Sequence, residues 1–451
     1  MDLKNFTIFE DKTIEEAMGL IAKNKYGMVL VSDRFGKIVG TATDGDIREV
    51  LLKNGSLKQQ ISLCMERNFV FVTENFSREK ILKLFVNGVN VIPILSDESK
   101  LIDIVARDSL LQPNPKKTIA FSRAPVRVSF GGGGSDVINF FEDSPGAVLN
   151  TTINRFAYAS LKVRNDPSIK IYSYDYDITL SFDRFSDFKF NQSNLPLVHS
   201  VLSLIKPNHG FELFLQSDFP SSSGLGGSSA IVASILGCFN ELREHKWQRY
   251  ELAELAYQAE RVVMNSAGGW QDQYATVFGG LNLMEFNFEK NIVIPIHLSK
   301  KDVAILESNL ILVDTGIKHN SSNIHIEQRI KLENEKSIKK KVVENVKLSY
   351  SIRDSILRGN FELVGKLLNE AWDAKKKFAR SVTNKDIDNI YANALENGAT
   401  GGKLLGAGGG GFFLFYVPQI QKIKFLNFLK REKLEFWQMH LDNQGLVSWS
   451  E

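Results

Sequence analysis

Three glycine-rich segments constrain what this chain of 451 residues can fold into. They are FGGGG at residues 130–134, SDFPSSSGLGGSSA ending at Ala230, and KLLGAGGGGF at residues 403–412. Because glycine has no Cβ, such loops can turn successive amide N–H groups toward an anion and approach it closely. Three of these segments in one chain predict that it binds a polyphosphate, and a nucleotide is the ligand we expect.

The central loop carries the strongest local signal. After Pro220 come three serines and GLGGSSA, followed by apolar residues at helical intervals from Ile231 to Leu242. Amides of the glycines and of Ser228 and Ser229 would face an anion at a helix N-terminus, where the helix dipole adds to the attraction. We therefore predict a phosphate site; the alternative is a flexible loop that Ser228 caps.

Two common nucleotide fingerprints do not fit these loops. A Walker-A loop needs Ser or Thr after its GK pair, whereas Leu404 follows the GK pair beside the third loop, and no other GK pair of the sequence is followed by Ser or Thr. Gly406, Gly408 and Gly411 satisfy GxGxxG, but the strand-like sequence FFLFYV follows them where a dinucleotide-binding fold needs a helix. The pattern argues against both a P-loop and a Rossmann fold.

Composition excludes several classes of function. The net charge of +3 is the small difference between 55 basic and 52 acidic residues, so no general attraction to nucleic acid or an anionic membrane follows. Cys64 and Cys238 lie far apart without metal-ligand spacing, which suits two buried thiols in a reducing compartment. The N-terminus has no apolar core for export. We expect a cytoplasmic protein that binds neither nucleic acid nor membranes.

Residues 1–112 contain an internal repeat. Each half is predicted to form, in order, a helix, a strand, a turn, a strand and a helix. This pattern resembles the paired CBS module, whose clefts often bind adenosine nucleotides. The resemblance implies that Gly40, Thr43 and Asp46 contact ribose and phosphate. In the second half Asp103 and Ala106 replace the corresponding Gly and Thr, so at most one nucleotide site is expected. The alternative is a dimerisation module without ligand, and such modules make a homodimer the expected assembly.

The remaining chain divides at weaker signals. Two prolines and paired lysines make residues 113–117 a linker. Strands are predicted at residues 125–130, 147–153 and 158–163, a helix at residues 250–264, and a charged, exposed helix at residues 320–349. The expected domains are 1–112, 118–297 and 298–451.

The three loops, in their order, resemble the motifs of the GHMP kinase superfamily, which includes galactokinase, homoserine kinase and mevalonate kinase. The first motif, PxRxS with a downstream Gly and Asp, matches Pro125, Arg127, Ser129, the glycines at 131–134 and Asp136. The resemblance covers residues 118–451 and implies an α+β fold of two kinase subdomains behind the CBS-like module. It also implies that the phosphate loop holds ATP. The expected nucleotide-binding residues are Ser222, Ser223, Gly224, Leu225, Gly226, Gly227, Ser228 and Ser229.

The resemblance assigns the catalytic residues. Glu260 lies at the edge of the apolar stripe of its predicted helix, and by resemblance it coordinates Mg²⁺ together with Ser229. A pair between Glu260 and Arg261 is the alternative. Asp272, in GGWQDQ, matches the base that accepts the hydroxyl proton, and Arg127 matches the cation beside the migrating phosphoryl group. The alternatives are a carboxylate that stabilises a helix dipole and a salt bridge.

Several segments, among them SRAPVRVSFGGGGSD and GGWQDQYATVFGG, are similar to those of the D-glycero-D-manno-heptose 7-phosphate kinases. This similarity implies phosphorylation of an anomeric hydroxyl to give a heptose 1,7-bisphosphate for surface polysaccharide precursors. The cation for the phosphate already on the sugar stays open among Arg123, Arg155, Arg329 and Lys403. A kinase for fucose or another monosaccharide, and a nucleotide-sensing protein with an inactive kinase domain, are the alternatives. The expected substrate-binding residues are Gly133, Gly134, Asp136, Lys403, Gly408 and Gly409.

Overall fold

The structure is a computed structural model of the chain, and it describes residues 3–53, 55–73, 78–86, 88–106, 118–189, 194–243, 245–317 and 321–451. The chain forms two compact units, Met1–Ser109 and Leu110–Glu451. The predicted linker at residues 113–117 lies outside the described residues, as does the helix expected to end the second half of the repeat.

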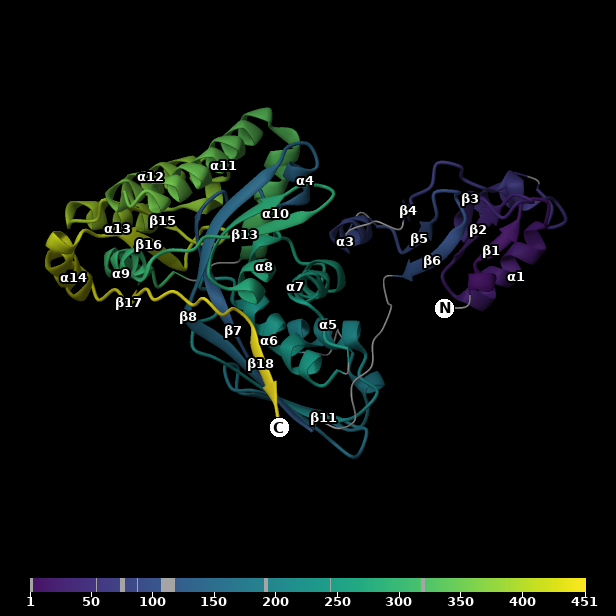
Figure 1. The fold of residues 1–451 in the computed structure, drawn as a ribbon, viewed down its shortest axis with the longest axis horizontal. Helices are drawn as coiled ribbons and strands as arrows, with labels where there is room; N and C mark the ends of the chain where they lie inside the picture. Colours follow the sequence, from purple (N-terminus) through teal and green to yellow (C-terminus); the bar gives the residue numbers. More distant parts are fainter. Residues whose placement is uncertain are drawn as a thin grey trace. The chain divides into compact units, whose positions relative to one another are not determined.

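The first unit has the predicted internal repeat (Figure 1). In its first half a helix, two antiparallel strands and a second helix follow one another, and the second half repeats the helix and the strand pair. The elements are η1 (Leu3–Asn5), β1 (Thr7–Phe9), α1 (Ile14–Asn24), β2 (Met28–Ser32), β3 (Ile38–Thr43), α2 (Asp44–Leu52), η2 (Ile61–Leu63), β4 (Val72–Thr73), α3 (Arg78–Val86), β5 (Val91–Leu95) and β6 (Leu101–Ala106).

Each half of the first unit builds a three-stranded sheet, in the orders β1-β2-β3 and β4-β5-β6. In both sheets the outer strand pairs in parallel with the middle one, which in turn pairs antiparallel with the third. Leu30 and Ile38 of the first half share one apolar cluster with Val91 and Ile104 of the second. The two halves therefore pack together through a common core.

The second unit begins with an eight-stranded sheet whose long strands are β7 and β8 (Figure 1). Its order is β10-β9-β11-β8-β12-β13, and β7 pairs with both β8 and β18. The helix α6 packs against β7 and β8. The elements up to β13 are β7 (Ile119–Gly131), α4 (Ile138–Phe141), β8 (Gly146–Val163), β9 (Ile169–Ser173), β10 (Ile178–Phe182), η3 (Phe185–Asp187), α5 (Pro196–Ile205), β11 (Phe211–Ser217), α6 (Gly227–Glu241), α7 (Arg249–Tyr257), η5 (Gln258–Val263), α8 (Gln271–Phe278), β12 (Leu281–Phe286) and β13 (Asn291–Pro295).

One long strand replaces two that the sequence predicts. The strands expected at residues 147–153 and 158–163 form the single strand β8 of 18 residues. The residues between them stay extended because two of their backbone N–H groups find partners outside the sheet. The N–H of Asn154 donates to His440 O, and that of Phe156 donates to Asp218 Oδ1.

Pro125 shapes β7 next to the site. Because proline has no N–H to donate, the pairing with β8 shifts register between Pro125 and Arg127. The N–H of Arg127 leaves the ladder and donates to Leu225 O at 2.9 Å. This bulge therefore ties β7 to the phosphate loop and directs Arg127 toward it.

The rest of the second unit is a four-stranded sheet with helices around it. Its strand order is β15-β16-β14-β17, and Trp372 of α12 packs against Phe413 of β16 in the core. The elements are α9 (Lys300–Asn309), β14 (Leu310–Asp314), α10 (Ser321–Asn334), α11 (Lys336–Leu357), α12 (Phe361–Lys375), η6 (Arg380–Val382), α13 (Lys385–Glu396), β15 (Gly401–Leu404), β16 (Phe412–Tyr416), η7 (Gln419–Gln421), α14 (Lys422–Arg431), β17 (Phe436–Gln438) and β18 (Val447–Ser450).

Two predicted helices are interrupted. The helix expected at residues 250–264 is α7 followed by η5, a wide π-helical turn in which the N–H of Met264 donates to Ala259 O. The helix expected at residues 320–349 is α10 and α11, separated by Glu335 in an extended conformation. It is also less exposed than predicted, because Ile338 and Val342 are buried.

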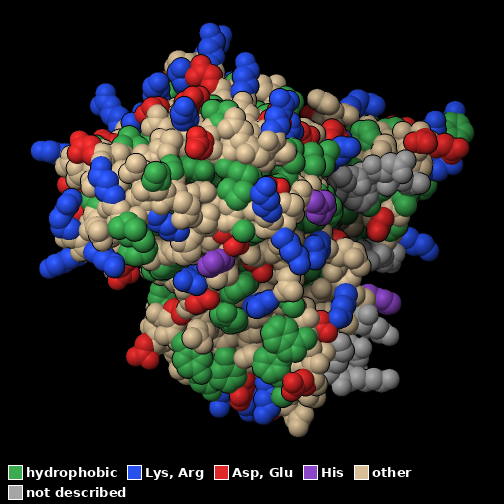
Figure 2. All heavy atoms as spheres, turned by 60° about the vertical axis from the view of Figure 1, so that its left-hand side comes forward, with side chains coloured by type: hydrophobic (Ala, Val, Ile, Leu, Met, Phe, Trp, Pro, Cys, Tyr) green, Lys and Arg blue, Asp and Glu red, His purple; other side chains and the backbone are tan. Residues whose placement is uncertain are grey.

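The predicted division of the second unit at residues 297 and 298 stays a prediction. The last strand crosses it, since β18 pairs with β7 in the first sheet. On the face drawn in Figure 2, Lys and Arg side chains are interspersed with Asp and Glu. None of the described helices is both long and apolar enough to cross a bilayer.

Candidate active site

The phosphate loop leads directly into α6, as predicted. Gly226 precedes the helix with a φ of 77°, a left-handed conformation that favours glycine. No side chain caps the helix, so the flexible loop capped by Ser228 is not what forms. The predicted nucleotide-binding residues 222–229 thus make up the loop and first turn, where helical amides lack intrahelical acceptors. That arrangement fits an anion.

The third glycine-rich loop packs on the phosphate loop. It joins β15 to β16, which confirms that a strand follows it and not a helix. The N–H of Phe412 donates to Ser223 O at 3.1 Å, and a Cβ on Gly406 would come within 2.7 Å of Gly224 Cα. Gly408, predicted with Gly409 to contact substrate, lies against Val382, and the N–H of Gly409 donates to Val382 O.

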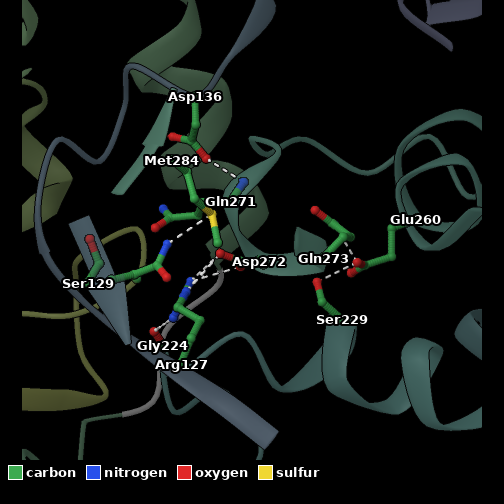
Figure 3. Close-up of polar contacts among 12 residues, drawn as sticks. Arg127, Ser129, Asp136, Gly224, Ser229, Glu260, Gln271, Asp272, Gln273 and Met284 are labelled. Carbon is green, nitrogen blue, oxygen red and sulfur yellow. Dashed lines mark hydrogen bonds and ion pairs between the residues drawn. The ribbon is translucent and has the colours of Figure 1, made fainter. Parts of the chain in front are cut away.

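Ser229 and Glu260 meet although 31 residues separate them (Figure 3). Ser229 Oγ donates to Glu260 Oε2 at 2.5 Å, and Gln273 Nε2 donates to the same oxygen. Glu260 is buried and forms no ion pair with any described residue. The alternative partner, Arg261, donates to Ser266 and Ala267 instead. A buried carboxylate with neutral donors only lacks a counter-charge, so this pair fits a bound cation.

The donor set resembles that of a magnesium site completed by the ligand. Among the described residues, no three His, Cys, Asp or Glu side chains are grouped so that they could hold a metal ion. Mg²⁺ binds one or two carboxylates, substrate phosphates and several waters, so a single carboxylate beside a hydroxyl is enough when a nucleotide is present. Ser229 and Glu260 therefore fit Mg²⁺ bound with a polyphosphate.

Arg127 and Asp272 form a bidentate ion pair at the end of the phosphate loop (Figure 3). The guanidinium donates from Nε to Asp272 Oδ1 and from Nη2 to Oδ2, both at 2.8 Å, while Nη1 donates to Gly224 O at 2.6 Å. The side chain of Arg127 is 5% exposed and that of Asp272 17%. The arginine thus fixes the orientation of the carboxylate relative to the loop.

Asp136 lies on the opposite side of Asp272 from the phosphate loop (Figure 3). Its carboxylate accepts hydrogen bonds from the N–H groups of Gly134 and Gln271, both at 3.2 Å. Burial, followed by the nearby charge of Asp272, raises the pKa of Asp136. Such a carboxylate can accept hydrogen bonds from sugar hydroxyls.

One cavity brings most of the predicted substrate and catalytic residues together. Arg127, Gly133, Gly134, Asp136, Asp272 and Lys403 all line it, and Gly406 lines it in place of Gly408 and Gly409. Of the four cations considered for a substrate phosphate, Lys403 alone is in this lining. Arg123 lies over Phe156 and Arg155 over Trp437, and Arg329 is exposed.

The cavity also contains residues that the sequence did not single out. Among them are Arg261 of η5, His325 of α10, Asn345 of α11 and Lys375 of α12. Only Arg261 gave a sequence signal, as the neighbour of Glu260. Helices from distant parts of the chain supply the others, so nothing local marks them.

Four buried polar atoms on the cavity wall have no hydrogen-bond partner. They are Ser129 Oγ, Arg261 Nε, Gln271 Oε1 and Asn345 Oδ1. Because buried polar groups are normally satisfied, their convergence on one cavity indicates a polar ligand.

The pKa values of three basic side chains in the cavity are strongly lowered. Burial, with the charge of Arg127, lowers the pKa of Lys403 to about 7. Burial also lowers the pKa of Lys375 far below its usual value, with the charges of Lys403 and Arg127 acting in the same direction. The pKa of His325 falls to about 4, because the ring is buried and near Arg261. Such a concentration of buried positive groups is typical of a functional site that receives an anion.

In the first unit only one of the three predicted nucleotide-binding residues lines a cleft. Thr43 lines a cleft of about 540 Å³, with Tyr26, Asp44 and Phe69. Asp46 is absent from the lining, and its carboxylate instead accepts from the N–H and the hydroxyl of Thr43 in a capping box at the start of α2. Gly40 is also absent from it, since its Cα faces the backbone of Glu66, whose oxygen a Cβ would approach to 2.8 Å.

Comparison with known proteins identifies the family. The model of the GHMP kinase N-terminal domain matches residues 196–280, and that of the GHMP kinase C-terminal domain matches residues 352–433. D-glycero-alpha-D-manno-heptose 7-phosphate kinase from Campylobacter jejuni is 32% identical over 340 residues, which cover 74% of this chain and 99% of the relative. The chain belongs to the GHMP kinases. It is a sugar kinase of this family, and the CBS domain model matches residues 1–53 and 59–112.

This GHMP kinase is also similar to other sugar kinases. The L-fucokinase/L-fucose-1-P guanylyltransferase of Bacteroides fragilis is 28% identical over 421 residues, covering 82% of this chain and 43% of the relative. The crystal structure of a D-glycero-D-manno-heptose 1-phosphate kinase from Bacteroides thetaiotaomicron matches with a TM-score of 0.62 and 28% identity, covering 73% of this chain and 98% of that one. These matches confirm the predicted α+β kinase fold behind a CBS module.

Proposed function

We propose that this GHMP kinase transfers the γ-phosphate of ATP to the anomeric hydroxyl of D-glycero-D-manno-heptose 7-phosphate, giving the 1,7-bisphosphate. The observation that carries the proposal is the cavity that joins Asp136, the Arg127–Asp272 pair and an excess of cations. Support comes from the heptose 7-phosphate kinase of Campylobacter jejuni, which aligns over 99% of its length. Two buried cysteines that form no disulfide suit the cytoplasm, where we place the enzyme.

In this proposal residues 222–229 bind the ATP phosphates through loop and first-turn amides. Ser229 and Glu260 would hold Mg²⁺, which when bound neutralises charge on the phosphates of the nucleotide. Gln273 keeps the Glu260 carboxylate oriented through its hydrogen bond. Glu260, which is buried without a counter-charge from the described residues, would be neutralised by such a metal.

Asp272 would accept the proton of the sugar hydroxyl as that oxygen attacks the γ-phosphorus. Arg127 holds the carboxylate through two hydrogen bonds and contacts Gly224 with its third nitrogen, so it lies beside the path of the phosphoryl group. Asp136 would accept hydrogen bonds from other sugar hydroxyls. Positioning and charge neutralisation contribute most of the acceleration in such a reaction, and the base contributes a smaller share.

A second candidate is a kinase for fucose, favoured by the match to 43% of the length of the L-fucokinase/L-fucose-1-P guanylyltransferase. A third, an inactive kinase domain that only senses nucleotide, fits the site less well. A protein without turnover has no chemical need for a buried Ser229–Glu260 pair together with an oriented Arg127–Asp272 pair.

One assay separates these candidates. ADP release is measured with Mg·ATP and a panel of free and phosphorylated heptoses and hexoses, with Asp272→Asn as the inactive control. We expect turnover with heptose 7-phosphate. Turnover with fucose but not with heptose 7-phosphate would favour the second candidate, and no turnover with any sugar would favour the third.

For the first unit we propose an adenosine nucleotide ligand in the cleft lined by Thr43, Tyr26 and Phe69. The cleft of about 540 Å³ is roomy enough for a nucleoside, and Asp44 offers a carboxylate for ribose hydroxyls. Adenosine nucleotides should raise the melting temperature of the first unit by linkage. The absence of any shift at millimolar concentration would leave this module a structural or partner-binding role.

A further inference from the structure

The kinase cavity is lined by more basic than acidic side chains. Arg127, Arg261, Lys375 and Lys403 line it, against the carboxylates of Asp136 and Asp272. Arg127 already pairs with Asp272. Because isolated buried charges are costly, the remaining cations indicate that the bound ligand is an anion.

The basic side chains of the cavity form two groups that differ in their hydrogen-bond acceptors. Lys375 Nζ donates to the carbonyls of Leu404 and Gly406, and Lys403 Nζ donates to that of Ser129. Both lysines lie near Arg127, whose charge contributes to lowering their pKa values. Since Arg127 contacts the phosphate loop through Gly224, this group serves the end of the cavity that faces ATP.

Arg261 belongs to a different part of the wall. It follows Glu260 in the π-helical turn η5, a type of turn that is frequent at functional sites. Glu260 points to Ser229 and the phosphate loop, whereas Arg261 lines the cavity that also contains Asp136. Consecutive residues of one turn thus serve the nucleotide and the sugar ends.

Hydrogen bonds hold the guanidinium of Arg261 through Nη1, and its Nε–Nη2 edge faces none of these acceptors. Its Nη1 donates to Ser266 Oγ at 2.8 Å and to Ala267 O at 3.2 Å. The group lies directly on Gly268, where a Cβ would come within 2.5 Å of its Cζ. Nε is buried without a hydrogen-bond partner, and Arg261 makes no ion pair with a described residue.

We propose that the Nε–Nη2 edge of Arg261 binds the phosphate monoester that the sugar already carries, so that this residue selects a phosphorylated acceptor. A guanidinium edge matches two phosphate oxygens in a bidentate arrangement, and a preoriented one gives specificity as well as affinity. His325, neutral at pH 7 beside Arg261, can add a neutral hydrogen bond. The inference rests on the proposed sugar kinase activity and deepens it.

The test compares one pair of acceptors, heptose 7-phosphate and the free heptose, in wild type and in Arg261→Gln. Wild type should prefer the phosphorylated sugar. In the variant, KM for heptose 7-phosphate should rise roughly 10- to 100-fold, as expected for loss of a charge-assisted pair. KM for ATP and the turnover of free heptose should not change. Arg261→Lys should fall between, because lysine keeps the charge without the bidentate edge.

Arg329→Gln is the matched control, since Arg329 is exposed on α10 and absent from the cavity lining; it should behave as wild type. If Arg261→Gln lowered activity with both acceptors equally, the residue would support the fold of its loop, and the inference would fail while the kinase function stood. Equal use of both acceptors by wild type would also overturn it.

A binding measurement keeps the two proposals apart. If no acceptor gave ADP, the proposed function would fail, and calorimetric titration of the full chain with heptose 7-phosphate would then decide the role of Arg261. Weaker binding to Arg261→Gln than to wild type would support it. Equal affinities would overturn it.

Discussion

Pairs of a hydroxyl and a carboxylate lie at the N-terminal ends of helices in both units of this protein, and one pair from each unit makes a useful contrast. In the first unit Thr43 and Asp46, three residues apart, bond to each other at the exposed start of α2. In the second, Ser229 and Glu260 come from separate elements and are buried at the start of α6. The residue types are alike, but their surroundings differ.

The difference shows what a local pair and a distant pair can do. The capping box satisfies backbone N–H groups of its own helix, so its chemistry is complete without a ligand. The buried pair has neutral donors around a carboxylate and no cation among the described residues, so it stays incomplete until a ligand supplies positive charge. Long sequence separation together with burial is therefore the better indicator of a site.

The largest effect should come from the second unit. Asp272→Asn keeps the shape of the side chain but removes the base, so kcat should fall about 10² to 10⁴-fold. ATP affinity should change little, because Asp272 lies beyond the phosphate loop. ADP release and equilibrium ATP binding measure the two quantities; an unchanged kcat would remove Asp272 from the reaction.

A matched pair of substitutions tests the comparison itself. Glu260→Gln should raise the Mg²⁺ concentration needed for half-maximal activity by about 10- to 100-fold, since a metal ligand is lost. Asp46→Asn, the same change in the exposed pair, should leave the Mg²⁺ requirement unaltered. Magnesium titrations of both variants decide the matter, and equal responses would contradict the contrast drawn between the two pairs.

A smaller effect is expected on stability. Thr43→Ala removes the cap of α2 and should cost about 1 kcal/mol in the first unit. Hydrogen exchange should report faster opening of α2. Tryptophan fluorescence should report an unchanged unfolding of the second unit, which contains all five tryptophans. Loss of stability in both units would show that the cap acts beyond its own helix.

The smallest effect concerns proton uptake by Lys403. Its pKa is about 7 in the ligand-free fold, because burial and Arg127 disfavour the charged form. An anion bound nearby raises that pKa, so binding Mg·ATP at pH 8 should take up part of a proton. At pH 5.5 the lysine is already charged, and the uptake should vanish.

Calorimetry in two buffers of different ionisation enthalpy measures this uptake. Lys403→Met should show none at pH 8. Uptake of the same size at both pH values, or in the variant, would mean that another group titrates.

The sequence contains the loops and their order but not the arrangement of side chains around them. The phosphate loop, Glu260 and Asp272 are recognisable because each lies in a local pattern. Lys375 and His325 have no such pattern, since helices far along the chain bring them to the cavity. The wide turn η5, which contains both Glu260 and Arg261, also leaves no periodic signal.

Strand limits failed for a similar reason. The continuity of β8 depends on hydrogen bonds from Asn154 and Phe156 to partners more than sixty residues away. The local sequence shows two polar residues, Asn154 and Arg155, between the two predicted strands. In the first unit, the motif residue Gly40 packs against the backbone of Glu66, and Asp46 is hydrogen-bonded to Thr43. The sequence motif alone does not show these contacts.

A crystal structure of the full chain with Mg²⁺ and a non-hydrolysable ATP analogue tests the central claim most directly. The account predicts the phosphates against the amides of residues 222–229, with the metal between Ser229 and Glu260 and with Asp272 facing the γ-phosphate. A nucleotide bound elsewhere, or a metal that leaves Glu260 without a cation, would contradict it.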